Sequence, residues 1–128
     1  MKLRLEFNSI RFRLKRSEVE QFVRTGRVEE KIISGSGDDE TFRYVLESTG
    51  AVSTPRAVLK PRAVMVQVPP DAVMKWASTD QIGIESEQPV VHQASLRILI
   101  EKDFACIDGT DEQNADTFPN PLDAKIKK

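Results

Sequence analysis

Charged residues on several segments of the chain offer the clearest chemistry in the sequence. Arginine alternates with apolar residues, for example in Ile10-Arg11-Phe12-Arg13-Leu14. A guanidinium group carries a planar fork of donors that suits phosphate and carboxylate groups, so arginines that converge on a concave surface would form an anion site. The alternative is a solvated sheet face on which the same side chains form cross-strand salt bridges. The candidate ligand-binding residues are Arg4, Arg11, Arg13, Arg43, Arg97, Glu47 and Glu101.

Other reactive side chains form no recognisable catalytic or metal-binding set. Cys106 would need a neighbouring base to act as a nucleophile, and the only histidine, His92, falls in an expected loop, so we interpret them as a buried thiol and a solvent-facing imidazole. There is no glycine-rich phosphate loop, no Cys/His metal pattern and no G-x-S-x-G motif. We therefore predict no metal, no cofactor and no assigned catalytic residue. An acidic group fits no defined ion loop and is interpreted as a solvated tail: Glu101, Asp103, Asp108, Asp111, Glu112 and Asp116.

Size and composition limit the class of protein. A chain of 128 residues with 39% hydrophobic residues is long enough to bury a core as one domain. Because 19 basic residues are balanced by 20 acidic ones, no net charge attracts nucleic acid or an anionic membrane. A single cysteine excludes an internal disulfide, and the N-terminal segment lacks the apolar run of a signal peptide or membrane span. We expect a cytoplasmic protein that binds neither nucleic acid nor membrane.

Hydrophobic periodicity places the arginines on strands that flank two short helices. Alternating residues predict strands, whereas Val19 and Phe22, and later Val73 and Trp76, have helical spacing. Ser17 and Asp71 are the expected helix caps, Gly26 the expected end of the first helix, and Asn8-Ser9 the expected two-residue turn of the first hairpin. The predicted strands lie near residues 2–7, 10–14, 28–34, 41–47, 56–60, 63–68, 81–87 and 95–102, and the predicted helices near 17–25 and 71–79.

The pattern of the first half returns in the second half. Residues 3–47 align with residues 57–101 without a gap at an offset of 54, which matches Phe22 with Trp76 and Val28 with Ile82. We predict an α+β fold with two copies of a β-β-α-β-β unit, in an antiparallel barrel or a strongly curved sheet. Residues 1–107 would form one globular domain, and residues 108–128 a polar, partly flexible tail anchored near Phe118. The expected core is Leu5, Ile10, Phe12, Leu14, Val19, Phe22, Phe42, Val64, Val66, Val73, Trp76, Ile98 and Ile100.

Five stretches carry a resemblance to a known group of proteins. They are Asn8-Ser9-Ile10-Arg11, Arg16-Ser17-Glu18-Val19, Gly26-Arg27-Val28-Glu29-Glu30, the run from Leu96 to Cys106, and Phe118-Pro119-Asn120-Pro121. Through these stretches the chain resembles, over residues 2–122, an uncharacterised family of small bacterial cytosolic proteins, a domain of unknown function. The resemblance implies a bacterial origin and no mechanism.

A second, fold-level resemblance is to the CYTH or triphosphate-tunnel enzymes. Their barrels come from a duplicated strand-helix-three-strand unit, which is the order obtained here when the repeat is shifted by one strand. Those enzymes hold metal and triphosphate through an E-x-E-x-K motif on the first strand, and Lys2-Leu3-Arg4-Leu5-Glu6-Phe7 lacks that motif. The resemblance therefore bears on topology more than on catalysis.

Two functions remain open from the sequence. The first is a non-enzymatic binding or interaction domain of the bacterial cytoplasm, whose charged concave sheet face takes a protein or a small anionic ligand. The second is a metal-dependent phosphohydrolase, or a binder of polyphosphorylated ligands, on a degenerate triphosphate-tunnel-like barrel. Arginines that point into a closed barrel with Glu47 and Glu101 would favour the phosphorylated ligand, whereas arginines on an open convex face would count against it. The sequence decides neither whether the protein is an enzyme nor its oligomeric state.

Overall fold

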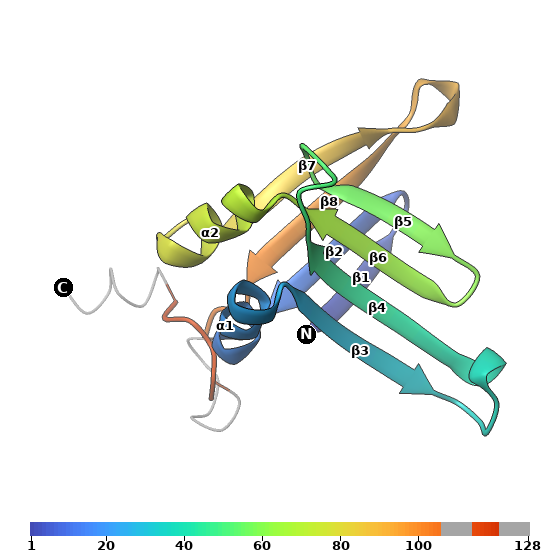
Figure 1. The fold of residues 1–128 in the computed structure, drawn as a ribbon, viewed down its shortest axis with the longest axis horizontal. Helices are drawn as coiled ribbons and strands as arrows, with labels where there is room; N and C mark the ends of the chain where they lie inside the picture. Colours follow the sequence, from blue (N-terminus) through green and yellow to red (C-terminus); the bar gives the residue numbers. More distant parts are fainter. Residues whose placement is uncertain (106–113, 121–128) are drawn as a thin grey trace.

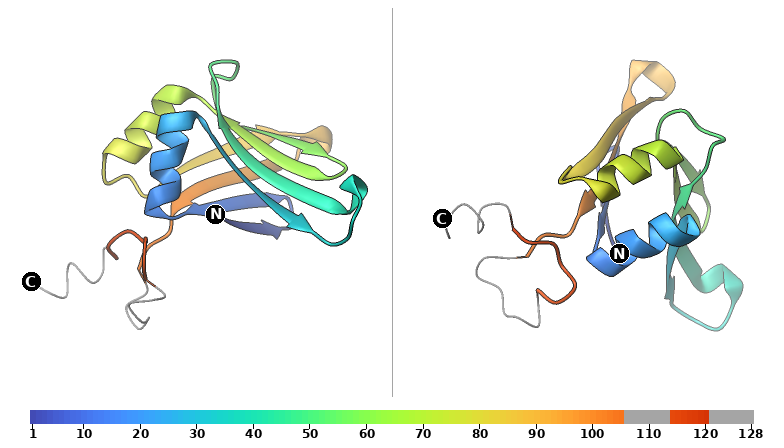
Figure 2. Two further views of the ribbon diagram at one scale, coloured as in Figure 1. Left: turned by 60° about the horizontal axis from the view of Figure 1, so that its bottom comes forward. Right: turned by 60° about the vertical axis from the view of Figure 1, so that its left-hand side comes forward.

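The computed structural model describes residues 1–105 and 114–120. In this part of the chain, two four-stranded sheets face each other and two α-helices lie across one end (Figure 1). Figure 2 shows that the hairpin turns point away from the helices. The elements are β1 (Lys2–Glu6), β2 (Ser9–Leu14), α1 (Arg16–Thr25), β3 (Arg27–Ile33), β4 (Thr41–Ser48), β5 (Arg56–Lys60), β6 (Ala63–Val68), α2 (Pro70–Ser78), β7 (Gly83–Pro89) and β8 (Ser95–Lys102), with short 3-10 turns at Asp38–Glu40 and Val91–Gln93.

The two sheets are open and mixed, so the predicted antiparallel barrel is wrong. Sheet A has the order β1-β2-β8-β7 and sheet B the order β3-β4-β6-β5. The outer pairs of each sheet are antiparallel hairpins, but the central pairs, β2 with β8 and β4 with β6, are parallel. Alternation in the sequence shows which side of a strand is buried but not the direction of its neighbour. Each sheet therefore joins a hairpin from one half of the chain to a hairpin from the other half.

The strand registers of the two halves correspond closely. Ser9 pairs with Arg97 between β2 and β8, and Ala63 pairs with Arg43 between β6 and β4, so both pairs differ by the offset of 54. The same offset relates the β1–β2 hairpin to the β5–β6 hairpin, where Lys2 opposite Arg13 becomes Arg56 opposite Gln67. Positions in one half can therefore be compared with positions in the other.

The gapless alignment is wrong at β3 and β7. Val28 lies opposite Leu46, and its counterpart opposite Ile100 is Ile84 rather than Ile82. Ile82 precedes β7 and is 52% exposed, whereas Ile84 is buried. A shift of two residues keeps every side chain on the same face of a strand, so the hydrophobic pattern alone does not reveal it.

The core lies between the sheets and beneath the helices. Phe12 of β2, Phe22 of α1 and Trp76 of α2 are fully buried, and the Phe12 and Tyr44 rings meet across the two sheets at 6.4 Å. Leu5 was predicted in the core but is 55% exposed, because the apolar faces separate toward the hairpin turns; Phe42 is partly buried. The other predicted core residues are buried, and Val28, Val45, Leu46, Ala57, Val68, Ile84 and Leu96 are buried as well.

Both helices start one residue before the predicted position, so neither predicted cap residue occupies the N-cap. Helix α1 begins at Arg16, so Ser17 is inside it, and Lys15 at the N-cap donates its backbone N–H to Glu18 at 2.9 Å. Helix α2 begins at Pro70, a residue suited to the first helical position, so Asp71 is not the cap either. The end of α1 at Gly26 is confirmed, with φ at 76° and its N–H bonded to the Phe22 carbonyl. The two-residue turn of the first hairpin is Phe7-Asn8, one residue earlier than predicted, with Asn8 at φ 48°.

A segment near the C-terminus packs against the start of α1. Asp116 accepts hydrogen bonds from the backbone N–H of Ser17 at 2.9 Å and from its hydroxyl, and these bonds hold the pKa of Asp116 below its usual value. Phe118 lies beside the cations of Arg16 and Lys102, 5.5 and 5.3 Å from the ring centre. Cys106, Asp108, Asp111 and Glu112, together with residues 121–128, lie outside the described residues.

Candidate functional site

Four cationic side chains line one hollow on the outer face of sheet A. In the β1–β2 hairpin Lys2 lies directly opposite Arg13, and Arg4 lies directly opposite Arg11. Residues directly opposite each other in an antiparallel pair share a face, so all four side chains project on the same side. With Leu3 they line a hollow of about 240 Å³, which we call the cationic hollow.

The ion pairs around the cationic hollow neutralise three of its four cations. Lys2 Nζ lies 3.2 Å from the buried Asp103, and Arg4 Nη2 lies 2.7 Å from Glu6 in an exposed pair. Arg11 is held by Glu101: Nη2 donates to Oε2 at 3.3 Å, and Nε lies 2.6 Å from Oε1 without an aligned hydrogen bond.

Arg13, which is half-buried, forms no hydrogen bond or ion pair with any described residue. As far as the described residues show, the hollow therefore keeps one uncompensated guanidinium group, that of Arg13, directly opposite Lys2. Like charges at such positions destabilise a hairpin unless something neutralises them.

A second hollow adjoins the first across Arg11. It has a volume of about 470 Å³, and Arg11, Arg97, Glu85 and Glu101 supply its charged walls. Gly83 forms part of this lining. A Cβ atom at this position would stand 2.9 Å from the Ile100 carbonyl oxygen, so the close strand pairing requires glycine, which adds no side chain to the hollow. Arg11 is thus a wall of both hollows.

The corresponding hairpin of the other half lacks the cluster of cations. On the outer face of β5–β6, Arg56 stands for Lys2, Val58 for Arg4, Met65 for Arg11 and Gln67 for Arg13. Gln67 donates to Glu47 at 3.3 Å. The fold therefore does not require arginine at positions 4, 11 and 13, because the same strand pairing forms with uncharged residues.

The structure divides the predicted site residues between the two sheets. Arg4, Arg11, Arg13, Arg97 and Glu101 lie in sheet A. The guanidinium group of Arg97, 53% exposed, donates to Glu85 at 2.8 and 3.1 Å and borders the second hollow only.

Arg43 and Glu47 lie on β4 of sheet B, so the two arginines related by the repeat do not meet. Arg43 faces Asp38 at 3.5 Å, and Glu47 is bound by Arg27 at 3.2 Å. Lys2 was not among the predicted site residues. The sequence did contain a signal for Lys2: it is two residues before Arg4 on the same strand, with Leu3 between them, so both cations must project on the same face.

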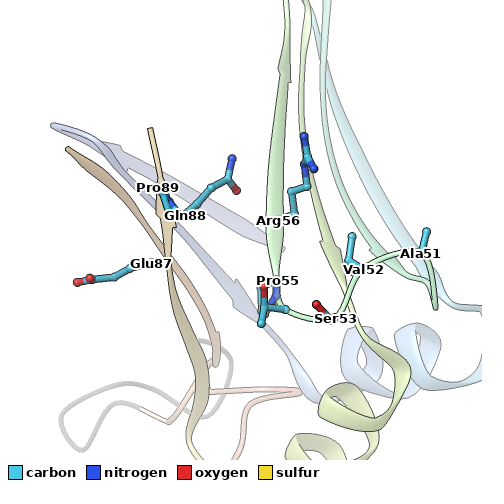
Figure 3. A pocket seen from close by; sticks show the side chains of 9 residues that line it. Ala51, Val52, Ser53, Pro55, Arg56, Glu87, Gln88 and Pro89 are labelled. Atoms are coloured by element: carbon cyan, nitrogen blue, oxygen red, sulfur yellow. The ribbon is translucent and has the colours of Figure 1, made fainter. Parts of the chain in front are cut away.

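A gap between the sheets opens at the edges β5 and β7, beside the linker that precedes β5. It has a volume of about 500 Å³ and its lining includes Pro55, Arg56 and Pro89. Figure 3 shows Gln88 projecting from β7 into this gap, while Glu87 points away from it. The Gln88 amide accepts from the Ala57 N–H at 2.7 Å and donates to the Ala57 carbonyl at 3.2 Å. The side chain of Gln88 therefore occupies the N–H and C=O of Ala57 in the way that the backbone of a neighbouring strand would.

Two further titratable groups are perturbed away from the hollows. Burial lowers the pKa of Lys102, whose ammonium donates to the Thr79 carbonyl at 2.7 Å, and Asp80 opposes this effect. Burial, followed by the charges of Glu30 and Glu18, raises the pKa of Tyr44, whose hydroxyl donates to the Met1 carbonyl at 3.1 Å. Both groups tie segments to the core and face neither hollow.

The described residues provide no group of three or more His, Cys, Asp or Glu side chains able to hold a metal ion. The described members of the predicted acidic group have different partners: Glu101 pairs with Arg11, Asp103 pairs with Lys2, and Asp116 accepts from the Ser17 N–H in the first turn of α1. His92 is exposed in the turn between β7 and β8. Within residues 1–105 and 114–120, no helix is both long and apolar enough to cross a membrane.

Comparison with known proteins places the chain in a family. Residues 1–122 match the model of a family described as Family of unknown function (DUF7009). The chain belongs to this family. No curated protein and no solved structure matches it.

Proposed function

We propose that this DUF7009 protein is a non-enzymatic binding domain that holds an anionic ligand in the cationic hollow. The observation that carries the proposal is the uncompensated guanidinium group of Arg13, which lies opposite Lys2 and next to the opposed pair Arg4 and Arg11. A bound anion would neutralise the charge of Arg13 and accept charge-assisted hydrogen bonds from planar donor groups. The uncharged residues at the three corresponding arginine positions of the β5–β6 hairpin support a role in binding, because the same pairing forms without those arginines.

The alternative of a phosphohydrolase or polyphosphate binder on a tunnel-like barrel has less support. Its ligand would need arginines that point into a closed barrel, but both sheets are open and the arginines lie opposite the apolar faces of their strands. Arg43 and Arg97, which were expected to act together, stand in different sheets. An external hollow suits a ligand that stays partly in solvent, and the described residues offer no group of three or more His, Cys, Asp or Glu side chains that could hold the metal ion of a phosphohydrolase.

The comparison between hairpins rests on a correspondence that we propose reflects an internal duplication of a β-β-α-β-β unit. The matching registers of β2–β8 and β6–β4 support this proposal, and so does the common order of elements in the two halves. The shift at β7 requires two additional residues before that strand and two fewer in the turn between β7 and β8. After such a duplication, the cations would have been gained in one hairpin or lost from the other.

A thermal-shift and calorimetric panel tests the proposed function. The probes are inorganic phosphate, pyrophosphate, triphosphate and hexaglutamate, each in low and high salt. A ligand at a hundred times its dissociation constant stabilises the folded state by about 2.7 kcal/mol, which gives a measurable rise in melting temperature. We expect at least one anion to bind, more weakly in high salt.

The matched variants are Arg13→Gln, which removes the uncompensated charge, and Arg24→Gln, which removes an exposed charge from the last turn of α1. Both variants lose one positive charge, so a general effect of net charge would appear in both. We expect only Arg13→Gln to weaken anion binding. Absence of binding by all four anions, or equal binding by both variants, would reject the proposed site.

A further inference from the structure

We propose that the free edge of β1 pairs with an extended peptide whose acidic and apolar side chains alternate. The inference rests on the proposed function, because the acidic side chains of the peptide would occupy the cationic hollow. It adds the class of ligand and the way in which the ligand is held. Strand addition at a sheet edge uses main-chain hydrogen bonds for affinity and alternate side chains for specificity.

The backbone of β1 is available for this pairing. Among residues 1–105 and 114–120, β1 is an outer strand of sheet A that pairs with β2 alone, from Lys2↔Arg13 to Glu6↔Ser9. The tight turn after Glu6 makes Glu6 and Ser9 the first hydrogen-bonded pair, so the amides of Lys2, Arg4 and Glu6 face β2. The N–H and C=O groups of Leu3 and Leu5 therefore face away from the sheet, toward the position of an added strand.

On β5, the strand of the other half that corresponds to β1, a side chain bonds to the outward-facing backbone groups. Ala57 corresponds to Leu3, and both its N–H and its C=O bond to the side-chain amide of Gln88 on β7. The position on β3 that corresponds to Gln88 is Ile32, which cannot make these bonds and is 59% exposed. The N–H and C=O of Ala57 on the β5 edge are thus bonded by a side chain of the opposite sheet, whereas Leu3 on the β1 edge has Ile32 at the position of that side chain.

The side chains around the β1 edge define the chemistry of the strand that would fit. On one side of the sheet an added strand would lie beside Lys2 and Arg4 in the cationic hollow. On the other side it would lie beside Leu5, which is 55% exposed, and toward Ile32 on the core-facing side of β3. Successive residues of a strand point to opposite faces, so acidic residues must alternate with apolar ones.

A second copy of β1 does not have this chemistry. Pairing β1 with β1 would bring the cations of two hairpins together on one face, which is unfavourable. Charged side chains on edge strands also discourage unwanted pairing between like edges. The cations therefore select against self-association and for an acidic partner.

Fluorescence anisotropy with labelled peptides tests the inference. The test peptide has eight residues that alternate Glu and Val, and the control peptide has the same composition in two blocks, four Glu followed by four Val. Both have blocked ends and equal charge, but only the first can place every carboxylate on one face of a strand. We expect the alternating peptide to bind at least tenfold more tightly, and Arg13→Gln, but not Arg24→Gln, to weaken it at least tenfold.

Amide hydrogen exchange of the full chain shows whether backbone pairing occurs. Binding of the alternating peptide should slow the exchange of the Leu3 and Leu5 amides at least tenfold and leave the Ala57 amide unchanged. Equal affinity for the two peptides, or unchanged exchange at both leucines, would overturn the inference while anion binding still supported the proposed function. Binding of pyrophosphate but of neither peptide would also overturn the strand-addition inference and support the proposed anion site. If neither peptides nor inorganic anions bind, both proposals fail and the cations serve only to prevent edge pairing.

Discussion

Replacing Arg13 by glutamine should change stability and binding in opposite directions. Arg13 forms no ion pair with a described residue and lies opposite Lys2, and a directly opposed pair of like charges costs about 0.2–1 kcal/mol. Glutamine already occupies the corresponding position as Gln67, where its amide donates to Glu47. Glu101 is the strand neighbour of Arg13, as Glu47 is of Gln67. A glutamine at position 13 therefore has a carboxylate in the position that binds Gln67. We therefore expect the free energy of unfolding to stay equal or to rise by up to about 1 kcal/mol.

The same substitution should weaken anion binding because it removes a charged donor. A hydrogen bond to a charged group contributes about 1.5–3 kcal/mol, which corresponds to a tenfold to hundredfold loss of affinity. Urea denaturation gives the free energy of unfolding, and calorimetry gives the dissociation constant for the anion that binds best. If Arg13→Gln lowers the free energy of unfolding by more than 1 kcal/mol and leaves affinity unchanged, Arg13 is a structural residue and the reasoning is refuted.

Three further changes test the fold around the site. Trp76→Ala should lower the free energy of unfolding by about 3–5 kcal/mol because the ring is fully buried, and a loss below 1 kcal/mol in urea denaturation would contradict this packing. Gln88→Ala leaves the N–H and C=O of the buried Ala57 unpaired, so we expect a loss of about 1–3 kcal/mol and faster exchange of the Ala57 amide, whereas unchanged exchange would show that the bond to Gln88 does not protect this amide. The bonds from Ser17 lower the pKa of Asp116, so their stabilisation is present above the usual pKa of 3.8 and is lost as the pH falls through the lower value in the folded state. Asp116→Asn should therefore be less stable than the wild type near pH 6 and approach it near pH 2, as measured by urea denaturation, and a constant difference would show that the carboxylate charge is irrelevant.

The sequence predicts the local elements well because each leaves a periodic signal. Every predicted strand and helix exists, and the stripe from Val19 to Phe22 and the Gly26 stop lie where the pattern places them. The architecture was missed because it depends on long-range pairing. Nothing in the alternation of β2 or β4 shows that each has a parallel neighbour from the other half of the chain.

The candidate site was only partly predictable for the same reason. Alternation placed Arg4, Arg11 and Arg13 opposite the apolar residues of their own strands, and the short turn placed the first arginine close to the other two. It could not show that Arg43 belongs to another sheet, or that the exposed Leu5 lies at a splayed edge rather than in the core. The bonds from Gln88 to Ala57 join β7 of one sheet to β5 of the other, so the difference between the β5 edge and the β1 edge could not be read from the sequence.

Titration of isotope-labelled protein with the alternating Glu–Val peptide, followed by two-dimensional NMR, tests the central claim most directly. If the cationic hollow and the β1 edge form the site, the largest shifts of backbone amides will fall on Lys2–Glu6 and on Arg11–Arg13 and will fade in high salt. The amides around Arg43 on sheet B then serve as the internal control and should not move. Shifts centred on Arg43, or no shift in the β1–β2 hairpin at saturating peptide, would contradict the account.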